Sequence, residues 1–416
     1  MLSLLQITAA LLVLTAAFAW ANHKLIRLPH TIGLLVMGFL ASLVLVGLEF
    51  SFPDVPIFHE MTTIVRRIDF PGALLDGMLA FLLFAGALHV DFSKLRGRAT
   101  TIAVMATVGV IISTITIAAA AWWLGNILGA PISFAWALVF GALISPTDPV
   151  AVLSTLKDVD LPETLETDMI GESLFNDGVG VVLFTILLSA ALSGQGGAGF
   201  SVPDIASIFF VEAGGGAALG LVTGYVAYRA MRAIDEYVIE VLISLALVTG
   251  SYALASGFHL SGPIAVVVAG LLIGTRGTAD AMSETTRDYL YAFWTLIDEI
   301  LNSVLFLLIG LEVLVLSFSR GNFWLALAVI PAALIARLAA VAIPVISLKP
   351  VVGFVRGTIP ILTWGGIRGG ISIALALSIP GVAERPILLT ATYCVAVFSI
   401  VVQGLTLSAL ARRYAD

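Results

Sequence analysis

Charged side chains are scarce in this sequence of 416 residues: they make up 11% of it, whereas hydrophobic residues make up 60%. A soluble globular domain carries about 25% charged residues, so a water-soluble enzyme or binding domain is excluded. The mean hydropathy is +1.08, and a membrane-spanning helix needs roughly 20 apolar residues. The composition therefore predicts an all-α polytopic membrane protein, with residues 1–416 forming one transmembrane domain.

Cysteine pairs, basic runs and metal-ligand spacings are also lacking. The single cysteine, Cys394, lies in an apolar stretch, which excludes an internal disulfide or a paired-cysteine site. The net charge is −7 and there is no basic run, so nucleic acid is not expected as a partner. The five histidines are scattered, and none has the spacing of a metal site. We expect no cofactor.

Hydropathy and helix-breaking residues divide the chain into thirteen predicted spans. They cover about residues 4–21, 28–48, 72–90, 100–125, 133–153, 168–194, 205–230, 237–257, 261–275, 287–317, 322–347, 359–379 and 386–411. The ninth span is short and the tenth is long, so these two are expected to be tilted or irregular.

Basic residues in the connections predict the orientation, because cytoplasmic loops carry an excess of lysine and arginine. One alternate set of connections carries only Arg66, Arg67, Arg320 and Arg385. The other set carries fourteen basic residues, namely Lys24, Arg27, Lys94, Arg96, Arg98, Lys157, Arg229, Arg232, Arg276, Arg287, Lys349, Arg356, Arg412 and Arg413. The second set is therefore expected in the cytoplasm, with the N-terminus outside and the C-terminus inside.

An aspartate stands between two prolines in the fifth span, in Ser145-Pro146-Thr147-Asp148-Pro149. Proline has no amide hydrogen, and the residue before a proline is disfavoured in a helix, so this segment is expected to be unwound. Unwound backbone at membrane depth must line a cavity or be buried in protein. The freed carbonyls, the Thr147 hydroxyl and the Asp148 carboxylate are hard oxygen ligands that suit an alkali cation. The alternative is a proline kink with a buried, protonated aspartate.

Polar side chains also gather on the sixth span. Ser173, Asp177 and Gly180 recur at i, i+4 and i+7 and share one stripe of the helix, while Glu172 and Asn176 form the neighbouring stripe. Ionisable groups at bilayer depth are costly and mark functional sites. The alternative is a polar network that only holds helices together.

Four glycines surround an arginine in the twelfth span, in Gly365-Gly366-Ile367-Arg368-Gly369-Gly370. Each glycine weakens a helix by about 1 kcal/mol, which predicts a second broken helix. Arg368 stays protonated, so it must pair with Glu172 or Asp148 or point into the cavity. Interrupted spans, one in each half of the chain, are typical of inverted-repeat transporters whose broken helices cross at mid-membrane.

The tenth span carries further polar residues, Asp298, Glu299, Asn302 and Glu312. They either line a vestibule or form a structural ion pair with Arg337 of the eleventh span. The ion pair is the favoured interpretation.

The segments Ser145–Pro149, Gly171–Gly178 and Gly366–Gly369 together resemble the NhaP/NHE type of sodium:proton antiporter, the first family of monovalent cation:proton antiporters. The resemblance covers essentially the whole chain and implies a thirteen-helix antiporter fold. It also implies a homodimer with a mobile core and a scaffold for dimerisation. The core would comprise roughly residues 100–194 and 322–411, and the scaffold roughly residues 1–90 and 205–317.

The same resemblance implies roles for single residues. Asp177 would bind both the cation and the proton, and Asp148, Thr147 and Ser173 would complete the Na⁺ shell. Asn176 is also counted with the cation- and proton-binding residues, at the place where electrogenic relatives have a second aspartate. Glu172 and Arg368 would form the supporting ion pair behind the site.

Competition for one carboxylate is the expected mechanism. Burial raises the pKa of a carboxylate and a bound cation lowers it, so Asp177 can hold a proton or Na⁺ but not both. Alternating access then exchanges Na⁺ or Li⁺ for H⁺, one for one, without enzymatic chemistry. The expected place is the bacterial inner membrane, and the expected role is pH and sodium homeostasis.

Three alternatives stand beside this interpretation. A K⁺/H⁺ antiporter would use the same site, and a channel would differ only in lacking coupling to protons. An intramembrane aspartyl protease also needs two membrane aspartates. Its Gly-x-Gly-Asp signature is absent from the sequence, so it is a remote alternative.

Overall fold

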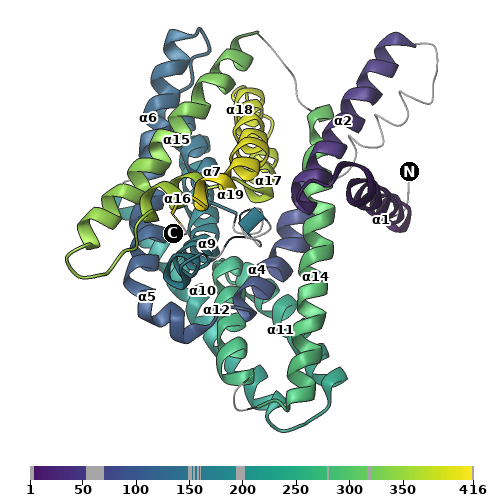
Figure 1. The fold of residues 1–416 in the computed structure, drawn as a ribbon. Helices are drawn as coiled ribbons and strands as arrows, with labels where there is room; N and C mark the ends of the chain where they lie inside the picture. The colour runs from purple at the N-terminus through teal and green to yellow at the C-terminus, as the bar shows by residue number, and fades with distance from the viewer. Residues whose placement is uncertain are drawn as a thin grey trace.

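The computed structural model describes residues 4–52, 70–148, 152, 155–156, 159, 161–193, 202–278, 281–315 and 320–414. Within these residues every regular element is helical, which confirms the predicted all-α class (Figure 1). Eight of the described helices are long and apolar enough to cross a membrane, and three shorter apolar helices accompany them. The count of thirteen spans stays a prediction.

The helices of the first half follow the predicted spans closely. Between the second and third spans, residues 53–69 lie outside the described residues. The helices are α1 (Leu4–Ala21), α2 (His30–Ser51), a π-helical segment (Gly72–Met78) leading into α4 (Leu79–Leu88), α5 (Phe92–Val104), a second π-helical segment (Met105–Gly109), α6 (Val110–Ile127), α7 (Phe134–Ile144), α9 (Glu163–Ser193) and α10 (Val202–Met231).

The second half contains the other predicted break. Its helices are α11 (Tyr237–Gly257), α12 (Gly262–Leu272) with a π-helical end (Ile273–Gly277), α14 (Glu284–Leu311) with a 3₁₀ turn (Glu312–Val315), α15 (Arg320–Leu348), α16 (Thr358–Trp364), α17 (Gly370–Ser378), α18 (Arg385–Phe398), a π-helical segment (Ser399–Gln403) and α19 (Gly404–Ala411). The twelfth predicted span is thus two helices, α16 and α17, rather than one.

Side-chain caps fix where several helices begin. The fourth span starts at Phe92, earlier than predicted, because the Asp91 carboxylate accepts the amide hydrogen of Ser93 at 2.8 Å. Serines cap α7, α12 and α14 in the same way, each accepting from an amide in the first turn. These polar residues fix the start of each helix within an otherwise apolar sequence.

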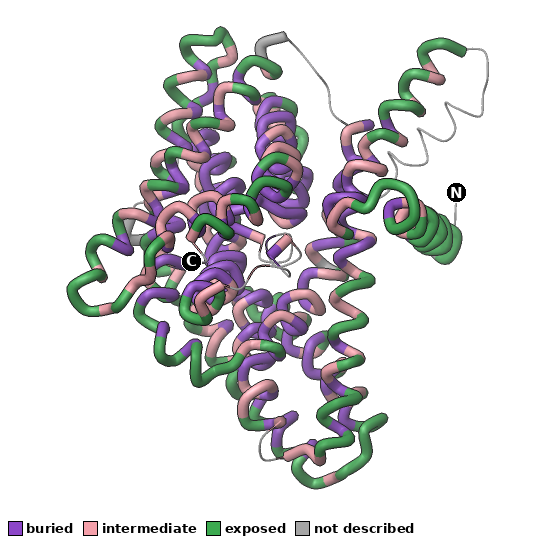
Figure 2. Tube along the Cα trace, in the orientation of Figure 1, coloured by how far each residue is buried: buried purple, intermediate pink, exposed green. Residues whose placement is uncertain are grey.

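Two clusters of buried apolar side chains hold the helices together. One lies around α6, α7, α9 and α15 to α19, and also takes in α2 and the second half of α14. The other joins α4, α10, α11 and α12 to the first half of α14. Buried residues fill the centre of the molecule, whereas the outer face of α1 is exposed (Figure 2). α14 therefore contributes side chains to both clusters. The predicted ranges place residues 205–317, and so all of α14, in the scaffold alone.

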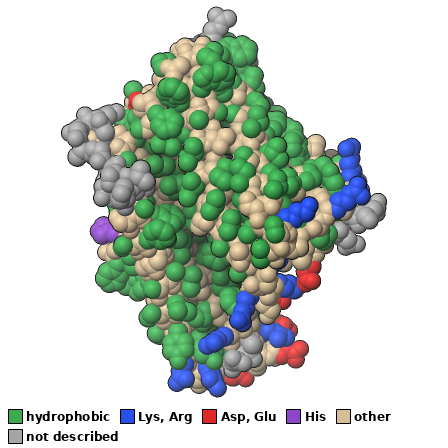
Figure 3. All heavy atoms as spheres, turned by 90° about the vertical axis from the view of Figure 1, so that its left-hand side faces the viewer, with side chains coloured by type: hydrophobic (Ala, Val, Ile, Leu, Met, Phe, Trp, Pro, Cys, Tyr) green, Lys and Arg blue, Asp and Glu red, His purple; other side chains and the backbone are tan. Residues whose placement is uncertain are grey.

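The outer surface is apolar, as a membrane protein requires. Figure 3 shows hydrophobic side chains covering most of one face, with many of the charged side chains toward its lower end. Lys157, Arg66 and Arg67, which entered the prediction of orientation, lie outside the described residues.

Candidate functional site

Two unwound segments meet where the sequence predicts broken helices. α7 ends at Ile144, and the chain from Pro146 to Asp148 leaves the helix, as does the segment 366–369 between α16 and α17. The Asp148 amide donates a hydrogen bond to the Ile367 carbonyl at 2.8 Å. The two breaks therefore cross and are joined backbone to backbone. Pro149 lies outside the described residues.

Asn176 of α9 holds the first unwound segment in place. Its side-chain oxygen accepts the Thr147 amide hydrogen at 3.2 Å, and its amide nitrogen donates to the Thr147 hydroxyl at 2.9 Å. The Thr147 and Ser173 hydroxyls share a further hydrogen bond of 3.0 Å. Asn176 is completely buried, so these bonds satisfy groups that water cannot reach.

The two predicted carboxylates lie near one another beside this network. Asp177 follows Asn176 on α9 and is 5% exposed, whereas Asp148 is half-buried. The Asp148 charge acts on Asp177, so the two groups are within electrostatic range. Two like charges in a low-dielectric interior repel strongly. The arrangement thus favours a cation or a proton held between them.

Glycine is required where the segments approach most closely. A Cβ at Gly180 of α9 would overlap the Pro146 ring, and one at Gly369 would overlap the Asp148 carboxylate. Both positions therefore need a residue without a side chain, which explains why glycines sit among the polar residues of the sixth and twelfth spans.

Arg368 donates hydrogen bonds to backbone carbonyls at the end of α7, one of which a proline leaves without a donor. Its guanidinium, 2% exposed, donates to the carbonyls of Ser145 at 3.0 Å and Pro146 at 3.2 Å. In a continuous helix the Ser145 carbonyl would accept from residue 149, which is a proline without an amide hydrogen. A cation at the carboxyl end of α7 also complements the helix dipole.

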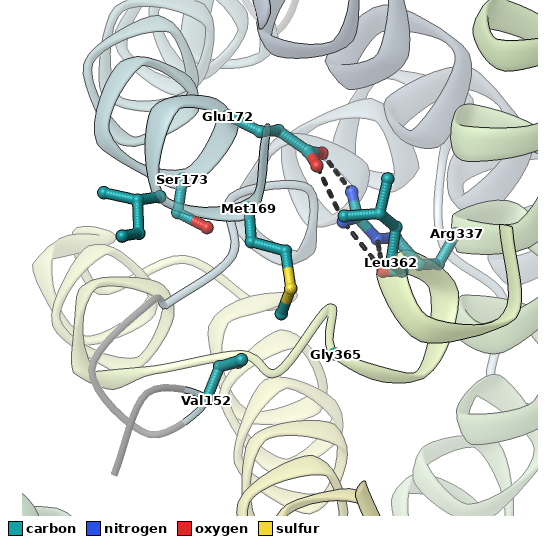
Figure 4. A pocket seen from close by; sticks show the side chains of 8 residues that line it. Val152, Met169, Glu172, Ser173, Arg337, Leu362 and Gly365 are labelled. Atoms are coloured by element: carbon teal, nitrogen blue, oxygen red, sulfur yellow. Dashed lines mark hydrogen bonds and ion pairs between the residues drawn. The ribbon is translucent and has the colours of Figure 1, made fainter. Parts of the chain in front are cut away.

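The predicted ion pair between Glu172 and Arg368 is wrong. Glu172 pairs instead with Arg337 of α15, in a two-pronged contact that includes Nη2–Oε2 at 3.0 Å (Figure 4). Arg337 also donates through Nε to the Leu362 carbonyl at 3.1 Å. Glu172 faces α15, whereas Arg368 is occupied by the end of α7. The favoured pair between Arg337 and the acids of α14 is wrong for the same reason.

Comparison with known proteins agrees with this geometry. Residues 12–413 match the family described as "Sodium/hydrogen exchanger, transmembrane". The Na(+)/H(+) antiporter NhaP of Pseudomonas aeruginosa is 46% identical over 415 residues, which cover 99% of this chain and 97% of that protein. The chain belongs to the sodium/hydrogen exchanger family. The predicted resemblance is therefore confirmed.

Other members of the exchanger family and a solved structure extend the comparison. The Na(+)/H(+) antiporter NhaH of Halobacillus dabanensis is 36% identical, covering 98% of this chain and 97% of its own. The sodium proton antiporter MjNhaP1 of Methanocaldococcus jannaschii matches with a TM-score of 0.73 at 20% identity, covering 98% of this chain and 97% of that one. This structural likeness supports the antiporter fold.

A second buried ion pair in this exchanger-family chain was not foreseen. Arg98 of α5 donates through Nε to Asp168 of α9 at 2.8 Å and through Nη1 to the Gly353 carbonyl at 2.8 Å. Its guanidinium also lies 4.9 Å from the centre of the Phe354 ring. In the sequence, Arg98 stands out only as one of the basic residues expected in the cytoplasm, although Asp168 at the start of the sixth span was an available partner.

Proposed function

We propose that this protein is a secondary antiporter that exchanges Na⁺ or Li⁺ for H⁺ by alternating access. The observation that carries the proposal is the hydrogen bond from Asp148 to Ile367, which brings both unwound segments to the pair of aspartates. Family membership and the names of the relatives, Na(+)/H(+) antiporters, support sodium over the potassium alternative. Nothing in the site or the family favours a protease.

We assign the cation shell to Asp177, Asp148, Thr147 and Ser173. The two hydroxyls and two carboxylates supply hard oxygen ligands for a small monovalent cation. Asn176 keeps the Thr147 backbone and hydroxyl in place, so its role is to position a ligand. Arg368 and the Glu172–Arg337 pair stay outside the shell, because a permanent positive charge in contact with the cation would repel it.

Exchange is proposed to be electroneutral. Asp177 is the one carboxylate that takes up and releases the proton, and Asp148 serves as a permanently charged ligand. The cation-loaded and proton-loaded forms then carry the same net charge. No cofactor is needed, because the gradient of one ion drives the other.

The proposed assembly is a homodimer in the bacterial inner membrane, with the N-terminus outside and the C-terminus in the cytoplasm. The helices between about residues 100–194 and 322–411 would form the mobile core, and those between about residues 1–90 and 205–317 the scaffold. The excess of basic residues in one set of connections supports the orientation. The physiological role of the protein would be pH and sodium homeostasis.

Reconstitution in vesicles tests the exchange activity. Na⁺, Li⁺ and K⁺ are added in turn to vesicles that carry an imposed pH gradient, and dissipation of the gradient is followed with a pH-sensitive dye. Na⁺ and Li⁺ should dissipate it, and Asp177→Asn should abolish the response while the protein remains folded by size-exclusion chromatography. Robust exchange by Asp177→Asn would sink the assignment of Asp177, and a response to K⁺ alone would establish the potassium alternative.

A further inference from the structure

An acidic side chain on α14 lies on the helix face that approaches the crossing. Asp298, Asn302 and Leu305 recur at i, i+4 and i+7 and so share one face of α14. Leu305 packs where a side chain at Gly370 would stand, at the start of α17. This face of α14 is therefore in contact with the start of α17, directly after the second unwound segment.

Asp298 is held in a defined position on that face. The Asn302 side-chain amide donates to its Oδ1 at 3.0 Å, and Asn302 is itself buried. Within the part of the chain that the structure describes, no lysine or arginine forms an ion pair with Asp298. Arg337, the partner that the sequence suggested, is occupied by Glu172.

The charge of Asp298 reaches the cation site. The start of α17 that Leu305 contacts follows Gly369, which lies directly against the Asp148 carboxylate. Asp148 acts electrostatically on Asp298, so the two carboxylates are in range of one another. Asp298 is half-buried, so part of its surface stays accessible.

The position of Asp298 along α14 indicates the side of the membrane from which a cation would approach the site. Asp298 lies fourteen residues from Glu284, which is about 21 Å along the axis at 1.5 Å per residue. Arg287 lies in the first turn of α14, and Arg276 lies at the end of the preceding helix; both place the Glu284 end on the proposed cytoplasmic side. Asp298 stands between that end and the crossing.

We propose that Asp298 is a capture residue, which draws the monovalent cation from the cytoplasmic side toward Asp148 and Asp177. This inference rests on the proposed antiport function. A fixed negative charge beside a low-dielectric cleft raises the local concentration of cations and their rate of arrival. Asp298 thereby sets the apparent affinity for the cation on one side, and the final shell on Asp148 and Asp177 is complete without it.

Initial rates of exchange against Na⁺ concentration test the inference in oriented vesicles. Asp298→Asn should raise the apparent KM for cytoplasmic-side Na⁺ roughly threefold to tenfold, and Vmax should change by less than about twofold because the final shell is intact. Asp298→Ser should behave in the same way, and Asp298→Glu should keep the KM close to that of the wild type. Raising the ionic strength with choline chloride should shrink the difference, since salt screens the charge.

Glu299→Gln is the matched control, because Glu299 is the next residue on the same helix, is exposed, and carries the same charge. It should leave KM and Vmax unchanged. An Asp298→Asn protein with the KM of Glu299→Gln, or with a lowered Vmax at an unchanged KM, would overturn capture. An equal rise of the KM for Na⁺ on the two sides of the membrane would overturn the proposal that Asp298 acts from the cytoplasmic side. Wild-type vesicles without Na⁺/H⁺ exchange would instead refute the proposed function itself.

Discussion

At the scale of single residues, the site contains side chains whose charge stays constant and one carboxylate whose charge is expected to change during exchange. The Arg368 guanidinium is committed to the Ser145 and Pro146 carbonyls, and Arg337 to Glu172. Asn176 adds no charge beside Asp177. The proposed exchange of a proton for a cation therefore falls on Asp177.

The apparent KM for Na⁺ should rise as the pH falls. Lower pH increases the protonated fraction of Asp177, and a protonated carboxyl cannot neutralise a cation. Where protonation dominates, each pH unit should raise the KM by up to about tenfold, while the rate at saturating Na⁺ changes less. Initial rates at several pH values in vesicles without a membrane potential measure this. A KM that is constant with pH would contradict competition at one carboxylate.

The pairing of Glu172 with Arg337 predicts a specific energetic coupling. Removing either partner leaves a buried charge uncompensated, so Glu172→Gln or Arg337→Met should each lower the free energy of unfolding by about 3–5 kcal/mol. The double variant Glu172→Gln/Arg337→Met should recover much of that loss. Thermal unfolding in detergent gives the comparison.

The control for this coupling combines Glu172→Gln with Arg368→Met. Arg368 does not pair with Glu172, so the two effects should be closer to additive. A larger coupling for residues 172 and 368 than for 172 and 337 would show that the ion pairing is assigned wrongly.

At the scale of secondary-structure elements, the site depends on how closely α9 approaches the first unwound segment. Gly180 leaves room for the Pro146 ring, and Gly178 leaves room for Ile264 of α12. Small residues at such contacts let helices and backbone come close in membrane proteins. The ligands Thr147 and Asp148 are therefore placed by packing as well as by hydrogen bonds.

Gly180→Ala should displace the unwound segment and lower Vmax at least about tenfold, because misplacing a ligand by about 1 Å is costly. Gly250→Ala is the control, since a Cβ at Gly250 in α11 meets nothing within 4 Å. It should leave exchange unchanged. Vesicle assays of both variants at equal protein content decide the matter, and full activity in Gly180→Ala would mean that the contact tolerates a methyl group.

At the scale of the whole molecule, the proposed cycle moves no net charge. One cation exchanges for one proton at the same carboxylate, so the membrane potential does no net work on the cycle. Rates of Na⁺/H⁺ exchange should therefore be the same in vesicles clamped at different potentials with valinomycin and K⁺, provided that K⁺ itself is not transported. Rates that follow the potential, or a measurable transport current, would defeat electroneutrality.

The sequence predicted the local features of this molecule better than its long-range partners. Pro146, Pro149 and the glycines around Arg368 act on the backbone at their own positions, so both helix breaks were predictable. The polar stripe of α9 followed from helical periodicity alone. In contrast, the partner of Glu172 lies 165 residues away on α15. Which arginine reaches it depends on how α15 packs against α16 and against the π-helical segment Met105–Gly109, which also contacts α9.

The backbone hydrogen bond between Asp148 and Ile367 also has a mechanical consequence. With Arg368 bonded to Ser145 and Pro146, it fastens the two broken spans to each other at two points. Neither span can slide alone without breaking these bonds, so the ligands travel together and keep their spacing. α14 contacts this crossing through side-chain packing, as at Leu305 and Gly370. In the proposed cycle, this frame would carry the cation as cargo past α14, which the proposal assigns to the scaffold.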